Sequence, residues 1–160
     1  MSAKSKTKIK KSPKMVTQRL DEVKKKLKGP KAVRVGLPKG ANPYPDGPSG
    51  TNGTSVIMVG FVHEFGSPAK GIPQRSFLRS SIKQNRRKYK KMIRKLADKI
   101  LQGKIDMKKA MQLLGSEAAG DVQERITEIS TPPLKYRKGN PLVDSGHLRQ
   151  SITYEVKDAD

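Results

Sequence analysis

The segment from His63 to Arg79 constrains the fold of this chain more than any other stretch. It reads His-Glu-Phe-Gly-Ser-Pro-Ala-Lys-Gly-Ile-Pro-Gln-Arg-Ser-Phe-Leu-Arg, and it stands between an apolar run and a long basic one. Its glycines allow backbone angles that other residues avoid, whereas its prolines fix φ and interrupt any continuous helix. The segment therefore predicts a turn with a defined path, which its large apolar side chains hold against the core on both sides.

Residues 1–14 are predicted to form a disordered basic arm. They are rich in lysine and contain few apolar side chains, so they bury too little surface to offset the entropy of ordering. Two interpretations stay open: a solvated tail that aids solubility, or a segment that contacts DNA or an acidic neighbouring subunit. The remainder, residues 15–160, is predicted to be a single domain.

A short amphipathic helix and a strand are expected after this arm. Apolar residues at positions 16, 20, 23 and 27 recur at helical spacing, and a Gly-Pro pair ends the run. Thr17 is expected to lie at the start of this helix as a capping residue. Val33, Val35 and Leu37 then alternate with smaller or charged residues, which predicts a strand. Residues 38–54 are rich in proline and glycine, and they predict a long loop.

The apolar run from Val56 to Phe65 is compatible with a buried helix or a buried strand, because periodicity does not separate the two. Thr54 is a suitable N-cap and favours the helix.

Two long helices are expected on the C-terminal side of the turn. Ser76 is a candidate cap for the first helix, and Gly103 ends it. Asp106 is the expected cap of the second helix. The first helix should bury an apolar stripe of Leu78, Ile82, Tyr89, Ile93, Leu96 and Ile100. The second should bury Met107, Met111, Leu114, Ala118, Val122, Ile126 and Ile129. A short connection predicts that the two helices form an antiparallel hairpin.

The C-terminal region is predicted to close the fold with a strand. Pro132-Pro133 ends the second long helix, and Asp144-Ser145-Gly146 turns the chain into a short helical segment around Leu148. Alternation from Ile152 to Val156 then predicts a strand. Together these elements predict an α+β fold, in which a small antiparallel sheet packs against the long helical hairpin.

Composition excludes several kinds of site. The chain has no cysteine, which excludes disulfides, thiolate zinc sites and cysteine nucleophiles. Aromatic residues make up only 4%, with no tryptophan, which disfavours single-strand binding by base stacking. No apolar run approaches the roughly 20 residues of a membrane span, and no signal peptide is recognisable. We therefore expect assembly in the cytoplasm and no contact with a membrane.

No metal site or cofactor is expected from the histidines. A zinc protease motif needs a second histidine four residues after the first, but position 67 is a serine and the only other histidine is His147. We expect His63 and Glu64 instead to hold the following turn by hydrogen bonds, or to pair with Arg75 or Arg79.

No catalytic residues are expected either, and the chain is not predicted to be an enzyme. Asp144, Ser145 and His147 are the residue types of a hydrolase triad, but triad groups come from separate segments so that each can point at the next. Asp144 and Ser145 are more plausible as caps of the turn from Gly146 to Gln150.

The strongest physical signal is the basic face of the first long helix. The formal charge of the chain is +21, and residues 83–97 contain no acidic residue. Like charges stacked on one helix destabilise it, so we expect an anionic partner, either DNA phosphates or an acidic protein; a plain solvated face is the alternative. The candidate contact residues are Lys83, Arg86, Arg87, Lys90, Arg94 and Lys95.

Two segments resemble one known protein family. The first is His-Glu-Phe-Gly followed by Ile-Pro-x-Arg-x-Phe-Leu-Arg, and the second is Pro-Leu-Val-Asp-Ser-Gly-His-Leu-Arg-Gln-Ser-Ile-Thr-Tyr. In this order, they resemble the head–tail joining or tail-completion (neck) proteins of tailed bacteriophages. Ser76 stands where that family commonly has proline, and Ser145 where it has threonine. The residues that carry the resemblance are His63, Glu64, Phe65, Gly66, Pro73, Arg75, Phe77, Leu78, Arg79, Asp144, Ser145, Gly146 and Leu148.

The resemblance implies a helix over the apolar run that precedes the turn. It also implies a structural virion protein that forms a homo-oligomeric ring, usually six- or twelve-fold, in the phage neck. Its neighbours would be the head adaptor or portal side and the tail-tube or tail-terminator proteins, and genomic DNA would pass through the lumen. The alternative is a standalone basic nucleic-acid-binding protein, which explains the charge but not the two segments.

Overall fold

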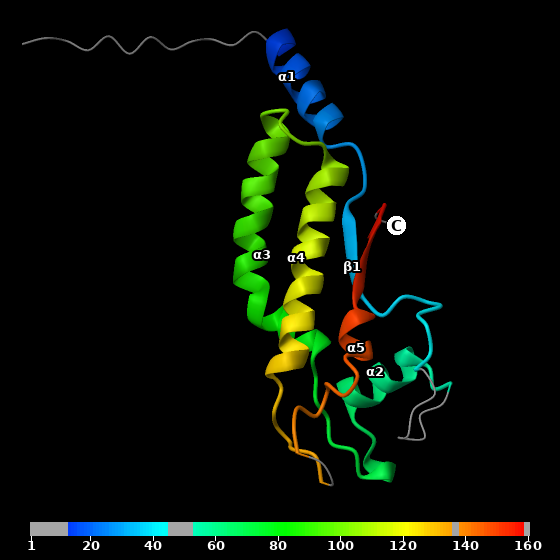
Figure 1. Cartoon of the computed structure of the whole chain (residues 1–160). Coiled ribbons are helices and arrows are strands. Elements are labelled where there is room, and N and C mark those ends of the chain that lie inside the picture. Colours follow the sequence, from blue (N-terminus) through cyan, green and yellow to red (C-terminus); the bar gives the residue numbers. More distant parts are fainter. Residues whose placement is uncertain (1–12, 45–52, 136–137, 159–160) are drawn as a thin grey trace, which may run out of the picture.

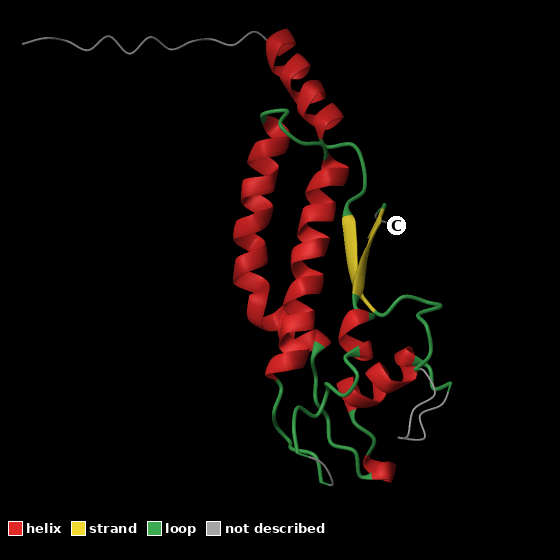
Figure 2. Ribbon diagram, viewed as in Figure 1, coloured by secondary structure: helices red, strands yellow, loops and turns green. Residues whose placement is uncertain are grey.

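The predicted α+β class is confirmed by the computed structural model, which describes residues 13–44, 53–135 and 138–158. Helix α4 lies between helix α3 on one side and a two-stranded antiparallel sheet on the other (Figure 1). Helices α2 and α5 close one end of this layered arrangement, and α1 extends beyond the other end (Figure 2). The elements are α1 (Pro13–Lys26), β1 (Ala32–Gly36), α2 (Val56–Phe65), a 3-10 turn (Pro68–Lys70), α3 (Leu78–Leu101), α4 (Met107–Glu128), α5 (His147–Gln150) and β2 (Thr153–Lys157).

The sheet pairs a strand from the N-terminal part of the chain with a strand from its C-terminal part. Strands β1 and β2 are antiparallel, with Val33 opposite Val156 and Val35 opposite Tyr154. A sheet of two strands has little stability alone, so α4 supports it along one face. Gly115 on α4 makes this contact possible, because a Cβ atom there would lie 2.3 Å from Cδ2 of Tyr154.

The main core lies where α2, α4 and α5 meet the start of α3. Its buried side chains come from elements far apart in the sequence, among them Val56, Phe77, Val122, Ile126, Leu148 and Ile152. A second, smaller cluster of Leu96, Ile100 and Ala110 closes the opposite end of the α3–α4 hairpin.

The predicted hairpin is confirmed, and so is the cap of α4, since Oδ1 of Asp106 accepts a hydrogen bond from the amide of Lys109 at 2.6 Å.

Helix α1 differs from the sequence prediction in two ways. It begins at Pro13, so residues 13 and 14 are helical and Thr17 lies inside the helix instead of capping it; the rest of the predicted arm lies outside the described residues. Its apolar face is exposed, and Leu20 keeps 54% of its surface in solvent. The reason is that α1 extends away from the body (Figure 1) and is anchored at its end, where Nζ of Lys26 donates to the carbonyl of Leu101.

Two further local predictions need correction. The apolar run is a helix, as expected, but the N-cap position of α2 is Ser55 and not Thr54, and the Ser55 side chain makes no capping hydrogen bond. The predicted apolar stripe of α3 is only partly buried, because Ile82 and Ile93 are exposed. These two residues lie on the edge of α3 that α4 does not cover.

Candidate functional site

The carboxylate of Glu64 organises the turn that the sequence singled out. Its oxygens accept hydrogen bonds from the amides of Phe77, Leu78 and Arg79 at 2.9, 2.9 and 3.2 Å. They also accept from the hydroxyl of Ser76 at 2.7 Å and from Nε of Arg79 at 2.8 Å. Glu64 is only 4% exposed. A side chain of α2 therefore caps the N-terminus of α3, where a negative charge is also favoured by the helix dipole.

This arrangement corrects one prediction and confirms another. Ser76 was expected to cap α3, but it precedes the N-cap Phe77 and its hydroxyl binds Glu64 instead. The predicted pairing of Glu64 with Arg79 is confirmed.

Burial by itself would raise the pKa of Glu64, but the hydrogen bonds from Ser76, Arg79 and Leu78 outweigh burial and hold that pKa below its ordinary value.

Arg75 connects the turn to the loop that follows α4. Its Nε donates to the carbonyl of Pro132 at 2.8 Å, and its Nη2 donates to the carbonyl of Pro133 at 3.2 Å. Its backbone amide donates to the carbonyl of His63 at 2.8 Å. Arg75 is 5% exposed. Arg75 was expected as a partner of His63 or Glu64, but its guanidinium binds the carbonyls of Pro132 and Pro133 instead.

The surroundings of His63 favour the neutral form of its ring. Burial, together with the positive charge of Arg75, holds the pKa of His63 below its ordinary value. Nδ1 of His63 is buried and has no hydrogen-bond partner among the described residues.

The second motif segment packs directly against the first. Leu148 of α5 lies in the same core as Phe77, and its Cδ1 lies 3.5 Å from the position of a Cβ on Gly60 of α2. The predicted cap of α5 is present in part, because Oγ of Ser145 accepts a hydrogen bond from the amide of His147 at 3.4 Å. The structure thus brings together two segments that are about 70 residues apart in the sequence, at the end of the molecule where α2 and α5 meet.

The two histidines line one cavity, although they are far apart in the sequence. This cavity of about 220 Å³ is also lined by Tyr44, Asp144 and Ser145. Nε2 of His147 lies 2.9 Å from the carbonyl oxygen of Asn42, to which it can donate, and its ring contacts that of Tyr44 at 4.9 Å. Within the described ranges, no three acidic or histidine side chains are grouped as metal ligands.

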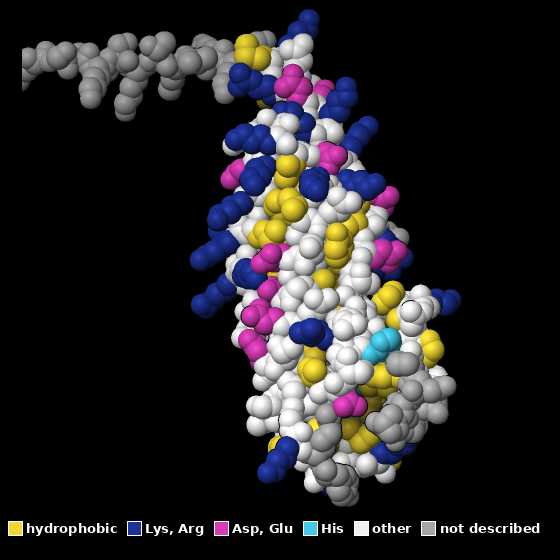
Figure 3. Space-filling model, viewed as in Figure 1, with side chains coloured by type: hydrophobic (Ala, Val, Ile, Leu, Met, Phe, Trp, Pro, Cys, Tyr) yellow, Lys and Arg dark blue, Asp and Glu magenta, His cyan; other side chains and the backbone are white. Residues whose placement is uncertain are grey.

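The predicted basic contact residues all lie exposed on α3. Lys83, Arg87, Lys90 and Arg94 follow each other at intervals of three or four residues, so they form one row on the side away from α4. Arg86 and Lys95 flank this row. Figure 3 shows lysine and arginine side chains projecting from this edge of the molecule. In the part of the chain that the structure describes, no acidic side chain lies within ion-pair distance of these six residues.

Lys88 belongs to a different set of contacts from the basic row. Its Nζ lies 2.6 Å from Glu117 and 2.6 Å from Asp121, both on α4. The hydrogen bonds that Lys88 donates to the carboxylates of Asp121 and Glu117 raise its pKa. Lys88 therefore does not face outward with the basic row, because its side chain crosses to α4 and neutralises the buried Asp121.

Sequence reasoning also missed Asn140, which connects α4 to the second motif segment. Its Nδ2 donates to the carbonyls of Ile126 and Thr127 at the end of α4. Its Oδ1 accepts from the amides of Leu142 and Val143 at 2.7 and 3.0 Å. In the sequence, the Asn-Pro pair at 140–141 indicates a turn at this position. It does not indicate which backbone groups the Asn140 side chain binds.

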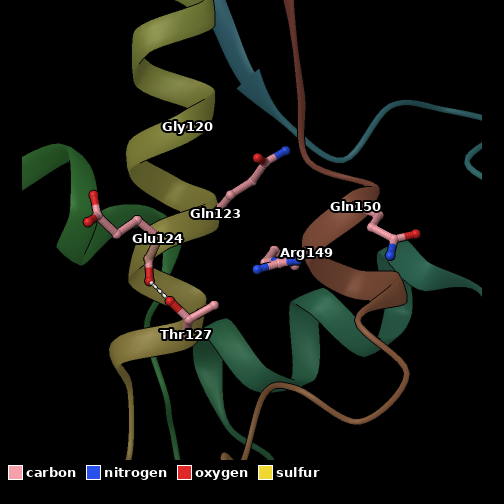
Figure 4. Close-up of a pocket in the computed structure, with 6 residues that line it drawn as sticks. All are labelled: Gly120, Gln123, Glu124, Thr127, Arg149 and Gln150. Atoms are coloured by element: carbon pink, nitrogen blue, oxygen red, sulfur yellow. Dashed lines mark hydrogen bonds between the residues drawn. The ribbon is translucent and has the colours of Figure 1, made fainter.

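A broad polar hollow lies between α4 and α5 (Figure 4). Its volume is about 670 Å³, and Arg149 extends into it from α5 toward α4. Thr127 donates its hydroxyl to the carbonyl of Glu124 at 2.6 Å, and Gln123 donates to the carbonyl of Ile152 at 3.1 Å. These groups are used within the fold, and none of them was predicted as a site residue.

Comparisons of the chain with protein-family models, with curated proteins and with solved structures found no match. None of the described helices is long and apolar enough to cross a membrane. Function is therefore indicated by the geometry of the turn, by the basic row of α3 and by the resemblance of the two motif segments.

Proposed function

We propose that the chain is a structural component of a tailed-phage neck, where it forms a ring that completes the joint between head and tail. The observation that carries this proposal is the basic row of α3, which faces outward without ion-pair partners among the described residues. The turn of the first motif fixes where this row begins, because Glu64 binds the first amides of α3.

The contacts of the motif residues support a structural role. Glu64 and Arg75 are buried and use their charged groups to connect segments of the fold. Phe77 and Leu148 fill the core that both motifs share. In this proposal the motif residues stabilise the subunit. The basic row of α3 then contacts an anionic neighbour or DNA in the lumen.

Contact between the basic row and DNA would be independent of sequence. Lysine and arginine on one exposed helix face bind phosphates, and they carry no information about the bases. Such binding weakens steeply as the salt concentration rises, because counterions are released on binding.

A standalone basic nucleic-acid-binding protein is the second candidate, because the same row of cations favours it. This candidate predicts tight, salt-sensitive binding to free duplex DNA and no ring. The neck proposal predicts a defect in joining when the gene is removed.

Electron microscopy of lysates distinguishes the two candidates. When the gene is deleted from the phage or prophage that carries it, DNA-filled heads beside complete, unattached tails are expected. Tails of abnormal length would move the role to tail termination. Normal infectious particles would exclude the neck proposal.

Charge reversal tests the basic row itself. Replacing Arg86, Arg87, Arg94 and Lys95 with glutamate is expected to abolish joining while the far-ultraviolet circular dichroism stays unchanged. A matched control reverses exposed lysines outside the row, at Lys104, Lys108 and Lys109. Joining that survives the first set of changes would exclude an electrostatic role for the row.

A further inference from the structure

An apolar groove runs along the side of the molecule between α2, β1 and the start of α3. Its α2 end is a hollow of about 210 Å³, lined by Ile57, Phe61 and Phe65 among others. Its α3 end is a wider hollow of about 620 Å³, lined by Val33 and Ile82 among others. Leu78 lines both hollows, so the two adjoin there and form one surface.

Large apolar side chains in this groove are left in solvent. Phe61 is 59% exposed, Phe65 is 49% exposed and Ile82 is 39% exposed. The rings of Phe61 and Phe65 contact each other at 4.7 Å, so the exposed carbon is contiguous and not scattered. A cluster of exposed aromatic and aliphatic side chains makes this hollow a candidate interaction surface.

The rim of the groove is positively charged. Arg79, Lys83 and Arg86 line its α3 end. The guanidinium of Arg79 lies 4.4 Å from the centre of the Phe65 ring, so this cation sits directly over the apolar floor. Lys83 and Arg86 have no ion-pair partner within the described residues. The groove therefore combines an apolar floor with a cationic rim.

The charge of this rim argues against an occupant from a second copy of the chain. The exposed apolar face of α1, around Leu20, is the candidate occupant that a second copy would offer. At 100° per residue, however, Arg19, Lys24 and Lys26 flank that face, so docking would place cations against cations. Residues 45–52 carry one aspartate and no large apolar side chain, so they cannot fill the groove either.

We infer that this groove binds an acidic amphipathic segment of a partner protein. Leucine- or phenylalanine-sized side chains of that segment would cover Phe61 and Ile82, as apolar anchors do in helix-in-groove recognition. Aspartate or glutamate beside them would face Lys83 and Arg86. The groove and its occupant are inferred from the structure alone. Only the source of the partner, an adjoining head or tail protein, rests on the proposed function.

Selection from a library of random 16-residue peptides displayed against the purified full chain tests this inference. The expected outcome is enrichment of peptides with apolar residues at helical spacing and with acidic residues beside them. The consensus peptide, labelled with a fluorophore, is then measured by anisotropy against the full chain and its variants.

Variants of exposed groove residues locate the binding surface. Phe61→Ser and Ile82→Ser should each weaken binding of the peptide about tenfold or more, as expected for apolar anchors. Lys83→Glu should also weaken binding of the peptide, and it should reduce the dependence of the peptide's affinity on salt concentration. Leu113→Ser is the matched control, because Leu113 is an exposed leucine on α4 outside both hollows, and this change should leave binding unaltered.

Three results would overturn the inference. The first is the absence of acidic amphipathic peptides among those enriched. The second is a consensus peptide that binds Phe61→Ser and Ile82→Ser as tightly as the unaltered chain. The third is self-association of the unaltered chain in sedimentation equilibrium that Phe61→Ser abolishes, because a second copy would then fill the groove. Peptide binding in the groove together with normal particles after gene deletion would retain the inference and exclude the neck proposal.

Discussion

Replacing Glu64 with alanine removes one carboxylate that holds the turn, α2 and the start of α3 together. The loss leaves the amides of Phe77 and Leu78 without their partner, and both amides lie at or near the core. A hydrogen bond to a charged group contributes about 1.5–3 kcal/mol, and breaking a buried charged pair costs about 3–5 kcal/mol. Because these bonds share one carboxylate, their contributions do not simply add.

We therefore expect Glu64→Ala to lower the free energy of unfolding by about 4 kcal/mol. For a chain of this length that change corresponds to a fall in Tm of about 10 °C. Urea denaturation followed by circular dichroism measures the first quantity, and thermal denaturation measures the second. Glu124→Ala, at an exposed position of α4, is the control and should change stability by less than about 0.5 kcal/mol.

The pH dependence provides an independent test of the same carboxylate. The pKa of Glu64 lies below its ordinary value in the folded chain. The stability that its charge contributes is therefore fully present above the unfolded-state pKa of about 4.3, and is lost as the pH falls through the folded-state pKa. The difference in unfolding free energy between the unaltered chain and Glu64→Gln should be constant from pH 7 to about pH 5, and should shrink below about pH 4.

A loss below about 1 kcal/mol for Glu64→Ala would refute this reasoning, because it would lie closer to the roughly 0.5 kcal/mol of a surface substitution than to the loss of several buried hydrogen bonds. A difference between the unaltered chain and Glu64→Gln that does not change down to pH 3 would refute the account of its charge.

Two further predictions concern close contacts and the buried arginine. Gly115→Ala should lower the free energy of unfolding by about 1–3 kcal/mol through overpacking, because the new methyl group would lie 2.3 Å from the ring of Tyr154. Gly120→Ala is its control on the same helix, since a Cβ there meets nothing within 4 Å, and it should raise stability by about 0.5–1 kcal/mol; equal effects of the two changes in urea denaturation would contradict the packing of β2 on α4. Arg75→Lys should lower stability by about 2 kcal/mol, because an ammonium group cannot reproduce the two-carbonyl geometry of the guanidinium, and an unchanged urea midpoint would contradict this role.

Much of the fold could be predicted from local sequence signals. The spacing of apolar residues located α3, α4 and both strands, and Asp106 located the start of α4. The errors occur where a partner distant in the sequence decides the outcome. Ser76 looked like a local cap, but the cap of α3 comes from Glu64 on another helix. The apolar spacing of α1 predicted an amphipathic helix, but it could not show that this apolar face stays largely in solvent.

The residues of the candidate site likewise fall into those that the sequence could place and those that it could not. The outward position of Lys83, Arg87, Lys90 and Arg94 could be predicted, because helical spacing alone places these residues on one face. The different position of Lys88 could not be predicted, because it depends on Asp121 of α4. The groove lined by Phe61 and Ile82 could not be predicted either, since α2, β1 and α3 form it only when they come together.

The sequence by itself determined most elements of this protein, their order and the sign of its charge, because periodicity, glycine, proline and lysine act over a few residues; for α2 periodicity left helix and strand open. Only the tertiary structure decided which charges are neutralised and which apolar residues remain in solvent. The physical reason is that ion pairing and burial depend on distances between side chains from different elements. Glu64 and Phe61 lie on the same helix, yet one is buried and satisfied and the other is exposed, because only one side of α2 faces the rest of the fold.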